Sequence, residues 1–187
     1  MLAPVTPAPT LGTLRTVPAL AAPDLLAPPV TAFLRAWPHA DDVAVAPIDP
    51  DLADTAAFVD AYGGPADASA NCVVVAGRRD GVERVAACVV LATTRADVNG
   101  AVRRLLDVRK ASFLPTDRAV EETDMEYGGI TPLGLPSGWR VLVDARVAAV
   151  ENVVVGSGVR HSKLVLPGRV LAEVPAAEVV EGLATPA

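Results

Sequence analysis

The sequence predicts a mixed α/β (α+β) fold, in which a single domain is built around a curved mixed β-sheet flanked by helices. The chain has 187 residues, the length of one ordinary domain, and 51% of them are apolar, enough to bury a full core. Short apolar runs typical of buried strands outnumber the helical patterns. Because the helical patterns occur irregularly between these runs, a mixed sheet is favoured over a regular alternation of strands and helices.

The N-terminal third of the chain contains an arm and two predicted helices. Residues 1–23 are rich in Pro and Ala and have no regular period, so we expect an N-terminal arm followed by the domain at residues 24–187. Apolar residues recur at helical spacing over residues 29–37, and a proline closes the segment. A second helix is predicted to open at Asp49, where acids and a proline occupy the first turn, and to end at the glycine pair 63–64.

Two apolar runs in the middle of the chain predict a β-hairpin. Residues 71–76 and 85–92 are rich in Val and Ala, and a linker of charged residues and glycines joins them. An amphipathic helix is predicted over residues 97–106, where the apolar side chains follow helical spacing. Residues 108–113 predict a strand, and residues 115–123 predict a short helix with a proline near its first turn.

The last third of the chain combines a glycine-rich loop with short strands. Residues 127–134 contain glycines and a proline in a pattern typical of a loop. Apolar runs predict strands at residues 141–143, 153–155 and 164–166, and a weaker pattern over residues 173–181 predicts a final strand.

The charge distribution excludes one class of protein and leaves one ligand class open. A net charge of −6 is unlike that of a general nucleic-acid coat, because nonspecific phosphate binding scales with the number of cations engaged. Residues 71–120 nevertheless hold nine basic and five acidic side chains. This basic segment either steers one phosphate-bearing ligand or forms a solvated, arginine-rich face.

Cysteine content and hydropathy indicate where the protein is located and whether it binds a metal. Cys72 and Cys88 form no C-x-x-C pair and the chain has two histidines, so we expect no metal site and two reduced, buried thiols. No apolar run approaches the roughly 18 residues of a membrane span, and the proline-punctuated N-terminus does not resemble a signal peptide. We therefore expect a cytoplasmic protein with no membrane partner.

Several common catalytic motifs are excluded because residues that they require are missing. The segment Gly156-Ser157-Gly158 follows an apolar run, but His161 occupies the third glycine position of a dinucleotide fingerprint. Ser162-Lys163 lacks the glycine that precedes the lysine of a phosphate loop. No G-x-S-x-G elbow is present, and neither histidine neighbours a plausible serine nucleophile. We expect no cofactor, and an ordinary hydrolase, kinase or dehydrogenase is disfavoured.

The loop that starts with Gly128-Gly129 is the most informative motif. Adjacent glycines let the backbone approach a ligand closely and present amide groups that no Cβ atom obstructs. Such donors can hold a phosphate, or an ester carbonyl whose oxygen becomes negative during attack. A tight structural turn is the alternative for an isolated glycine pair.

In context, the loop resembles the G-G-I-S-P-L-G loop of the YbaK/prolyl-tRNA editing family of aminoacyl-tRNA deacylases. Residues 128–134 match it with Thr131 in place of the usual serine. The resemblance extends to the core strands and to a glycine-rich turn, and it covers about residues 50–182. The matching segments are residues 69–76, 87–93, 143–144 and 154–160.

The resemblance implies a single YbaK-like domain that acts as a freestanding trans-editing deacylase. Its substrate would be the ester of a mischarged tRNA, a proline-type tRNA above all, and its partners the aminoacyl-tRNA acceptor end and a prolyl-tRNA synthetase. Family members place the aminoacyl carbonyl against glycine-loop amides and use the neighbouring ribose hydroxyl or the substrate's own side chain in the chemistry. Gly128 and Gly129 would then be the catalytic residues, Ile130 would contact the substrate, and Thr131 would help to fix the loop.

Two departures from the family pattern concern the predicted substrate-binding residues. The family's lysine on the first core strand aligns with Asn71, which brings no charge to a developing oxyanion. Lys163, Arg160 or an arginine of the basic segment would have to replace that cation, and Lys163 falls where cysteinyl-type relatives carry an acid. The family's serine before its double glycine aligns with Gly156, and the adjacent Ser157 is its candidate substitute.

Other polar residues have open interpretations. Residues 124–126 (Asp-Met-Glu) add negative charge beside the glycine loop, which would favour a cationic group such as a free α-ammonium over a phosphate. Asn71 either binds a ligand or satisfies the backbone of a buried strand. Asp144 at a strand end is expected to be a turn or capping residue, and His161 a surface or turn residue.

Two alternatives to the deacylase remain open. A non-catalytic YbaK-like module would bind an aminoacyl end, an amino acid or a nucleotide, and the replacement of the family lysine by Asn71 favours it. Hydrolysis that appears only in an Asn71→Lys variant would identify such a binder. A purely structural interaction module would instead have an occluded glycine loop with no adjoining cavity.

Overall fold

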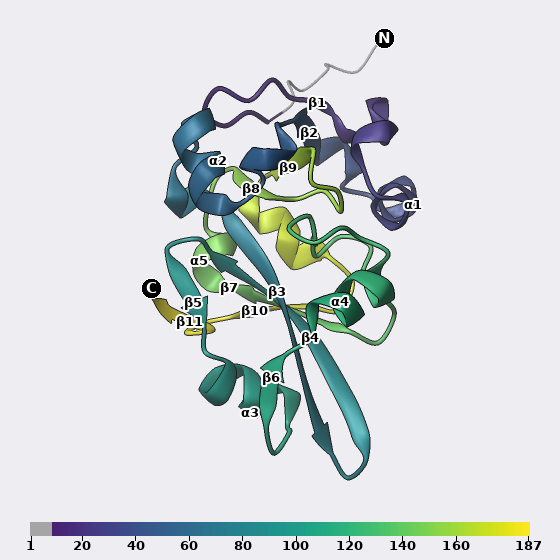
Figure 1. The fold of residues 1–187 in the computed structure, drawn as a ribbon, viewed down its shortest axis with the longest axis vertical. Helices are drawn as coiled ribbons and strands as arrows, with labels where there is room; N and C mark the ends of the chain where they lie inside the picture. The colour runs from purple at the N-terminus through teal and green to yellow at the C-terminus, as the bar shows by residue number, and fades with distance from the viewer. Residues whose placement is uncertain (1–8) are drawn as a thin grey trace.

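The computed structural model describes residues 9–187 and confirms the mixed α/β class (Figure 1). Residues 1–8 of the predicted arm lie outside the described residues. The strands are β1 (Val17–Pro18), β2 (Ala44–Pro47), β3 (Ala70–Arg79), β4 (Val82–Leu91), β5 (Thr94–Ala96), β6 (Ala111–Phe113), β7 (Arg140–Asp144), β8 (Val153–Gly156), β9 (Ser162–Leu166), β10 (Ala177–Val180) and β11 (Ala184–Pro186).

The helices are short, and several are single turns. The α-helices are α1 (Pro28–Ala36), α2 (Thr55–Tyr62), α3 (Arg103–Leu106), α4 (Thr116–Thr123) and α5 (Ala145–Ala148). The 3-10 helices are η1 (Ala19–Ala21), η2 (Pro23–Leu25), η3 (Ala40–Asp42), η4 (Pro50–Leu52), η5 (Ala66–Ala68) and η7 (Gly168–Glu173), and η6 (Val98–Val102) is a π-helix. Among the described residues, no helix is long and apolar enough to cross a membrane.

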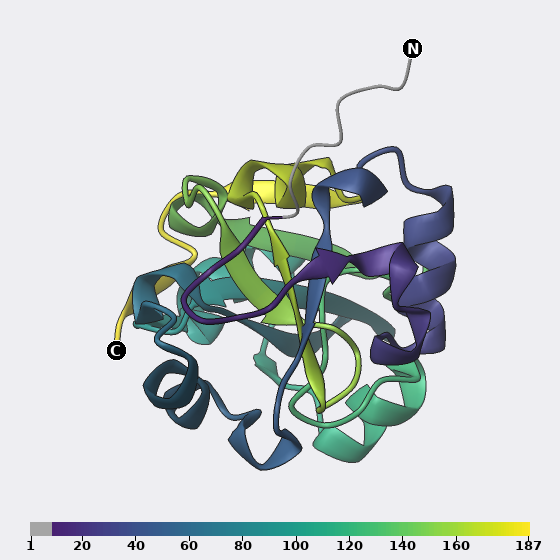
Figure 2. The ribbon, with the colours of Figure 1, turned by 90° about the horizontal axis from the view of Figure 1, so that it is seen from above.

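The strands divide between two larger sheets and a small one. A five-stranded mixed sheet has the order β10-β7-β4-β3-β6, and a four-stranded antiparallel sheet has the order β1-β2-β9-β8. A single parallel bridge between Ser69 and Val154 links the two sheets, and β11 pairs with β5. Figure 1 places the four-stranded sheet above the five-stranded one, and Figure 2 shows the same arrangement from above. The main core lies between these sheets and beneath α1 and η7.

The predicted hairpin is longer than the two apolar runs. β3 and β4 pair from Ala70–Leu91 to Arg79–Val82, and the turn is confined to Asp80 and Gly81. Both turn residues have positive φ, 52° and 81°, which suits a two-residue hairpin turn. Residues 77–79 belong to the strand rather than to the linker because their backbone groups are paired with β4.

The predicted helices form, with two local differences. The segment that opens at Asp49 splits into η4 and α2, because Asp49 caps the first turn through Oδ1 and Asp54 is the N-cap of a new helix. Gly63 ends α2 at a φ of 62°. The segment at 97–106 begins as the π-helix η6, whose N-terminal N–H groups donate to the carboxylate of Asp97, and continues as α3.

Elements outside the predicted set also contribute to the core. β1 falls in the segment predicted as an arm, where Val17 pairs opposite Val45 and the following Ala19 is fully buried. The domain boundary at residue 24 remains a prediction. The predicted set omits β2, a short apolar run that ends in a proline, and α5, a single helical turn that follows β7 directly.

Candidate functional site

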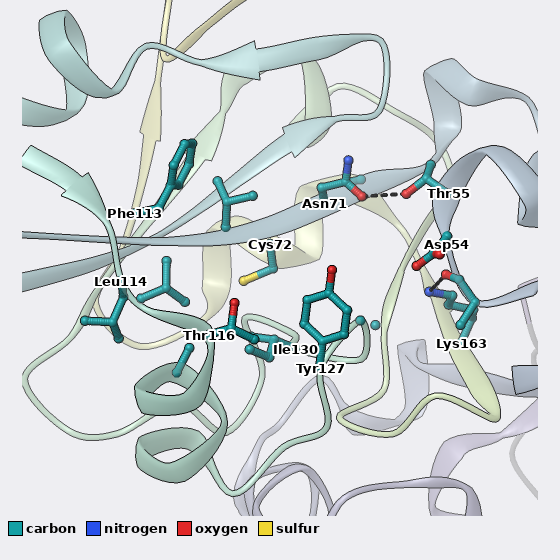
Figure 3. Close-up of a pocket in the computed structure, with 17 residues that line it drawn as sticks. Asp54, Thr55, Asn71, Cys72, Phe113, Leu114, Thr116, Tyr127, Ile130 and Lys163 are labelled. Carbon is teal, nitrogen blue, oxygen red and sulfur yellow. Dashed lines mark hydrogen bonds between the residues drawn. The ribbon is translucent and has the colours of Figure 1, made fainter. Parts of the chain in front are cut away.

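A cavity of about 350 Å³ opens between β3, the start of α4, the glycine loop and β9 (Figure 3). Its walls mix small apolar side chains with a few polar groups. The lining residues are Ala53, Asp54, Thr55, Ala70, Asn71, Cys72, Val73, Val74, Phe113, Leu114, Thr116, Ala119, Tyr127, Gly128, Ile130, Gly156 and Lys163. The structure therefore brings Asn71, Gly128, Ile130, Gly156 and Lys163 of the predicted site to one cavity.

One wall of the cavity is the free edge of β3. β6 pairs with β3 only from Val75 to Gly77, and the N–H of Leu114 donates to the carbonyl of Val74. Because backbone groups point alternately to the two sides of an antiparallel strand, Cys72 directs its N–H and C=O toward the same side as Val74. No strand pairs with β3 on that side at Cys72 within the described residues. The cavity thus has backbone donors and acceptors that a ligand can use.

The thiol of Cys72 lies in the cavity wall but is not an active nucleophile. Burial, and secondarily the nearby Cys88, raise the pKa of Cys72 far above its usual range. Since the thiolate is the reactive form, the Cys72 side chain stays a protonated, inert thiol at neutral pH. Both cysteines are free and Cys88 is buried, as the sequence predicts, whereas Cys72 is partly exposed in the cavity wall instead of being fully buried.

The side-chain amide of Asn71, which aligns with the family's lysine, points away from the face of β3 that carries the Cys72 thiol. The hydroxyl of Thr55 donates to Oδ1 of Asn71 at 2.8 Å. Figure 3 shows this amide and the thiol of Cys72 on opposite sides of β3, as the alternation of strand side chains requires. Ala70 therefore shares the face of β3 that carries Cys72.

Lys163 supplies a buried cation to the same cavity from a different sheet. It lies on β9 opposite Gly156 of β8, and its Nζ donates to the carbonyl of Ala53 at 2.9 Å. The ring centroid of Phe58 is 5.8 Å away. Lys163 is only 9% exposed, and burial lowers its pKa to about 8, with a further contribution from the charge of Arg160. At neutral pH the side chain is therefore still mainly charged, and it has little water around it.

The two loop glycines have different roles. Gly128 lines the cavity at a φ of 78°, and no acceptor within residues 9–187 takes its N–H. Gly129 lies behind it, where its N–H donates to the carbonyl of Glu126 and its own carbonyl accepts from Gly158. Only the first amide of the predicted pair is thus available to a ligand.

Glycines are required here because two backbone segments pack directly against each other. A Cβ atom on Gly156 would lie 2.3 Å from the carbonyl oxygen of Gly129, and one on Gly129 would lie 2.7 Å from the carbonyl oxygen of Val159. The hydroxyl of Ser157 is buried in the adjoining turn, 2.7 Å from that of Ser162. The structure therefore does not bring Gly129 or Ser157 to the cavity, and their proximity to the glycine loop reflects packing.

Thr131 and Ile130 also differ in position. Ile130 lines the cavity and packs against two of the apolar clusters. Thr131 is fully buried, does not line the cavity, and its hydroxyl has no hydrogen-bond partner among the described residues. The hydroxyl thus forms no hydrogen bond that would fix the loop, which instead rests on backbone bonds and on Arg160.

Arg160 braces the glycine loop at the mouth of the cavity. Its guanidinium donates to the carbonyl oxygens of Tyr127 and Pro50 at 3.2 and 3.1 Å, and its backbone N–H donates to the carboxylate of Glu126 at 2.6 Å. The carboxylate of Asp54 is 4.0 Å from the guanidinium. The carboxylate of Glu126, which belongs to the negative charge predicted beside the loop, therefore helps to hold the loop in place.

Sequence reasoning missed several lining residues. Asp54 and Thr55 precede or begin a helix, Thr116 opens α4, and Phe113 and Tyr127 are exposed aromatics at the rim. A pair of exposed aromatics around a glycine loop carries no spacing signal in the sequence, because β6 and the loop meet only in the fold.

The residues expected to be structural behave as such. Asp144 caps α5 through its contact with the N–H of Arg146 at 2.9 Å and pairs with the guanidinium of the same residue. His161 is exposed at a turn and contacts the carbonyl of Asp24. Neither residue lines the cavity.

Comparison with known proteins bears on the family and the fold. Residues 49–174 match the sequence model of a family described as "Aminoacyl-tRNA editing domain", which confirms the predicted resemblance. No curated protein shows significant sequence similarity to the chain.

Several solved structures share the fold. A hypothetical protein, APE2540, superposes with a TM-score of 0.66 and 21% identity, over 75% of this chain and 90% of its own. A protein proposed to be a trans-editing enzyme for prolyl tRNA synthetase superposes with a TM-score of 0.71 and 17% identity, over 83% of this chain and 94% of its own. A scaffold from the computational grafting of epitope backbones gives the same TM-score and identity, over 83% and 95%. At these identities the superpositions show a shared fold.

Proposed function

The chain belongs to the aminoacyl-tRNA editing domain family, and from that premise we propose that it is a freestanding trans-editing deacylase. It would hydrolyse the ester of a mischarged tRNA in the cytoplasm, with a proline-type tRNA as the favoured substrate and a prolyl-tRNA synthetase as the enzyme whose errors it removes. One observation carries the proposal: the buried ammonium of Lys163 and the N–H of Gly128, which no acceptor in residues 9–187 takes, line a single cavity.

The proposed reaction is addition of water to the ester carbonyl. The carbonyl oxygen becomes negative in the tetrahedral intermediate, and the bond from the carbonyl carbon to the ribose oxygen then breaks. The ribose oxygen takes a proton, and a free amino acid and an uncharged tRNA are released. Gly128 N–H and the Lys163 ammonium would stabilise the negative oxygen, a contribution that is large in a site with little water.

The lining residues favour a mechanism that borrows a group from the substrate. No histidine lines the cavity, and the Cys72 thiol is held protonated by burial. The free hydroxyl of the terminal ribose would therefore orient the attacking water, in keeping with the chemistry that the family resemblance implies. Asp54 is the one acidic residue among the described residues of the cavity wall, and it would pair with the α-ammonium of the aminoacyl group.

The direct test is deacylation of a proline-acceptor tRNA that carries alanine or cysteine. We expect release of the amino acid above the rate in buffer, and little release from the same tRNA correctly charged with proline. The Gly156→Ser variant is unsuitable as a probe of the site because a side chain there collides with the loop, whereas Asp54→Asn keeps the size of the side chain and removes only the charge proposed to pair with the α-ammonium. A release rate equal to that in buffer for every aminoacyl group would overturn the proposal.

A non-catalytic binding module is the second candidate. The observation that favours it is the position of Asn71, whose amide is engaged by Thr55 on the side of β3 away from Cys72. Under this alternative the native chain binds an aminoacyl end without hydrolysis, and hydrolysis emerges only in Asn71→Lys. Activity of the native chain that depends on Lys163 rules this alternative out.

A further inference from the structure

A second cavity adjoins the first and has a different chemical character. It also measures about 350 Å³, and it shares Phe113 and Leu114 with the first cavity. Its walls hold four basic side chains and one acidic side chain. The residues that matter here are Arg78, Glu83, Arg109, Lys110, Phe113 and Arg118.

Two of the four cations are neutralised within the protein, and two are not. Arg118 donates to Glu83 at 3.0 Å and to Glu122 at 2.5 Å. Glu83 also lies 3.4 Å from the guanidinium of Arg78, so two acids balance these two cations. Arg109 reaches an acid only at 3.8 Å, in a pair whose side chains are both largely exposed, and such pairs contribute little. Lys110 is exposed and has no ion pair among the described residues. Arg109 and Lys110 therefore leave a net positive charge in the second cavity.

Phe113 forms the wall between the two cavities and is 61% exposed. An exposed aromatic ring on a three-residue edge strand offers a flat apolar surface beside a charged groove. Aromatic rings next to basic grooves are the usual means of holding single-stranded nucleic acid, because bases stack on the ring while the cations contact the phosphates.

We propose that this second cavity, together with Phe113, binds the phosphate backbone of the single-stranded 3′ end of the substrate tRNA. The inference rests on the proposed function, in which the first cavity holds the aminoacyl ester. The chain of nucleotides would then leave the ester past Phe113, with a base stacked on its ring. The phosphates of the preceding nucleotides would contact Arg109 and Lys110.

Binding of an uncharged RNA tests the groove without any hydrolysis. The probe is an acceptor-stem hairpin with a single-stranded CCA end, titrated by fluorescence anisotropy at several salt concentrations. We expect Arg109→Glu/Lys110→Glu to weaken binding by at least tenfold and to reduce the log–log salt slope by about 1.4, at roughly 0.7 per lost single-strand phosphate contact. Phe113→Ala should weaken binding and leave the slope unchanged.

A matched control keeps the change in net charge and moves it elsewhere. Arg35→Glu/Arg169→Glu reverses two exposed arginines on α1 and η7 that form no ion pair among the described residues. In Figure 1, α1 lies in the upper part of the molecule and β6 in the lower part. The control should bind RNA nearly as well as the native chain. An equal loss in both double variants, or native affinity in Arg109→Glu/Lys110→Glu, would overturn the assignment of the groove.

Kinetics separate this inference from the proposed function. With an aminoacyl ester of adenosine, which lacks phosphates, Arg109→Glu/Lys110→Glu should retain native kcat/KM, whereas kcat/KM falls on the aminoacyl-tRNA. Equal losses on both substrates would contradict the groove. If the native chain hydrolyses neither ester while the variant still loses RNA affinity, the deacylase proposal fails and the groove assignment stands.

Discussion

The substitution Lys163→Met removes a buried charge whose burial opposes folding. The folded-state pKa of Lys163 is about 8, against 10.5 for a free side chain. This difference corresponds to about 3 kcal/mol of destabilisation at pH 7, because each pKa unit is worth about 1.4 kcal/mol. Methionine has a similar length and no charge, but it leaves the carbonyl of Ala53 without its donor, which costs about 1 kcal/mol. The variant should therefore be more stable than the native chain by about 1–2 kcal/mol at pH 7.

The sign of the pH dependence follows from the direction of the shift. Between about pH 8 and 10.5 the unfolded chain still binds the proton that folded Lys163 has lost, so the stability of the native chain rises with pH in this window. Lys163→Met has no titrating group here, so its stability does not rise in this window. The difference in free energy of unfolding by which the variant exceeds the native chain should therefore shrink by about 2–3 kcal/mol between pH 7 and pH 10.

Urea unfolding at both pH values, followed by tryptophan fluorescence, measures this difference. Lys110→Met removes an exposed lysine, and its free energy of unfolding should be almost equal to that of the native chain at either pH. A Lys163→Met variant that is less stable than the native chain at pH 7 by the same amount as at pH 10 would refute the claim that Lys163 is a strained, buried cation.

Three further predictions concern the same cavity. Deacylation should decline as the pH rises through about 8, because the Lys163 ammonium loses its proton there, and a pH–rate profile of kcat measures it; a steady rise through pH 9 would instead indicate Lys163 acting as a neutral base. Gly156→Ala should destabilise the fold by about 2 kcal/mol or more in urea unfolding, since the new Cβ would lie 2.3 Å from the carbonyl oxygen of Gly129, and an unchanged unfolding midpoint would contradict that packing. Cys72→Ala should keep most of the activity, and iodoacetamide should not inactivate the native chain at pH 8, because the pKa of Cys72 is raised by burial; rapid inactivation that the variant escapes would contradict this.

The fold class and most strands could be predicted because their signals are local. The apolar runs at β3, β4, β8 and β9 each show the pattern of buried strands, and Gly63 marks the end of α2 by its own conformation. The division into two larger sheets could not be predicted, since it depends on how strands as short as β1 and β2 pair with distant parts of the chain.

The site was predictable in part for a related reason. Gly128, Ile130 and Lys163 were singled out and meet at the cavity. The sequence could not separate Gly128 from Gly129, because the second amide is used by Glu126 only after the loop folds back on itself. Arg160 could be suggested only as a cation, since its role as a brace depends on carbonyl oxygens far away in the chain.

Asn71 illustrates how strand alternation limits alignment. A motif assigns a residue to a position along β3, but one step along a strand moves the side chain to the other face. The Asn71 amide meets Thr55, and the cation in the cavity comes from β9 instead.

Release of alanine from a mischarged proline-acceptor tRNA, measured for the native chain and for Lys163→Met in parallel, shows whether the cavity hydrolyses the ester with the help of the buried ammonium. We expect release well above the buffer rate for the native chain and a loss of about 100-fold or more in the variant, the effect of removing one stabilising group from an oxyanion. Release at the buffer rate by the native chain, or equal release by both proteins, would contradict this expectation.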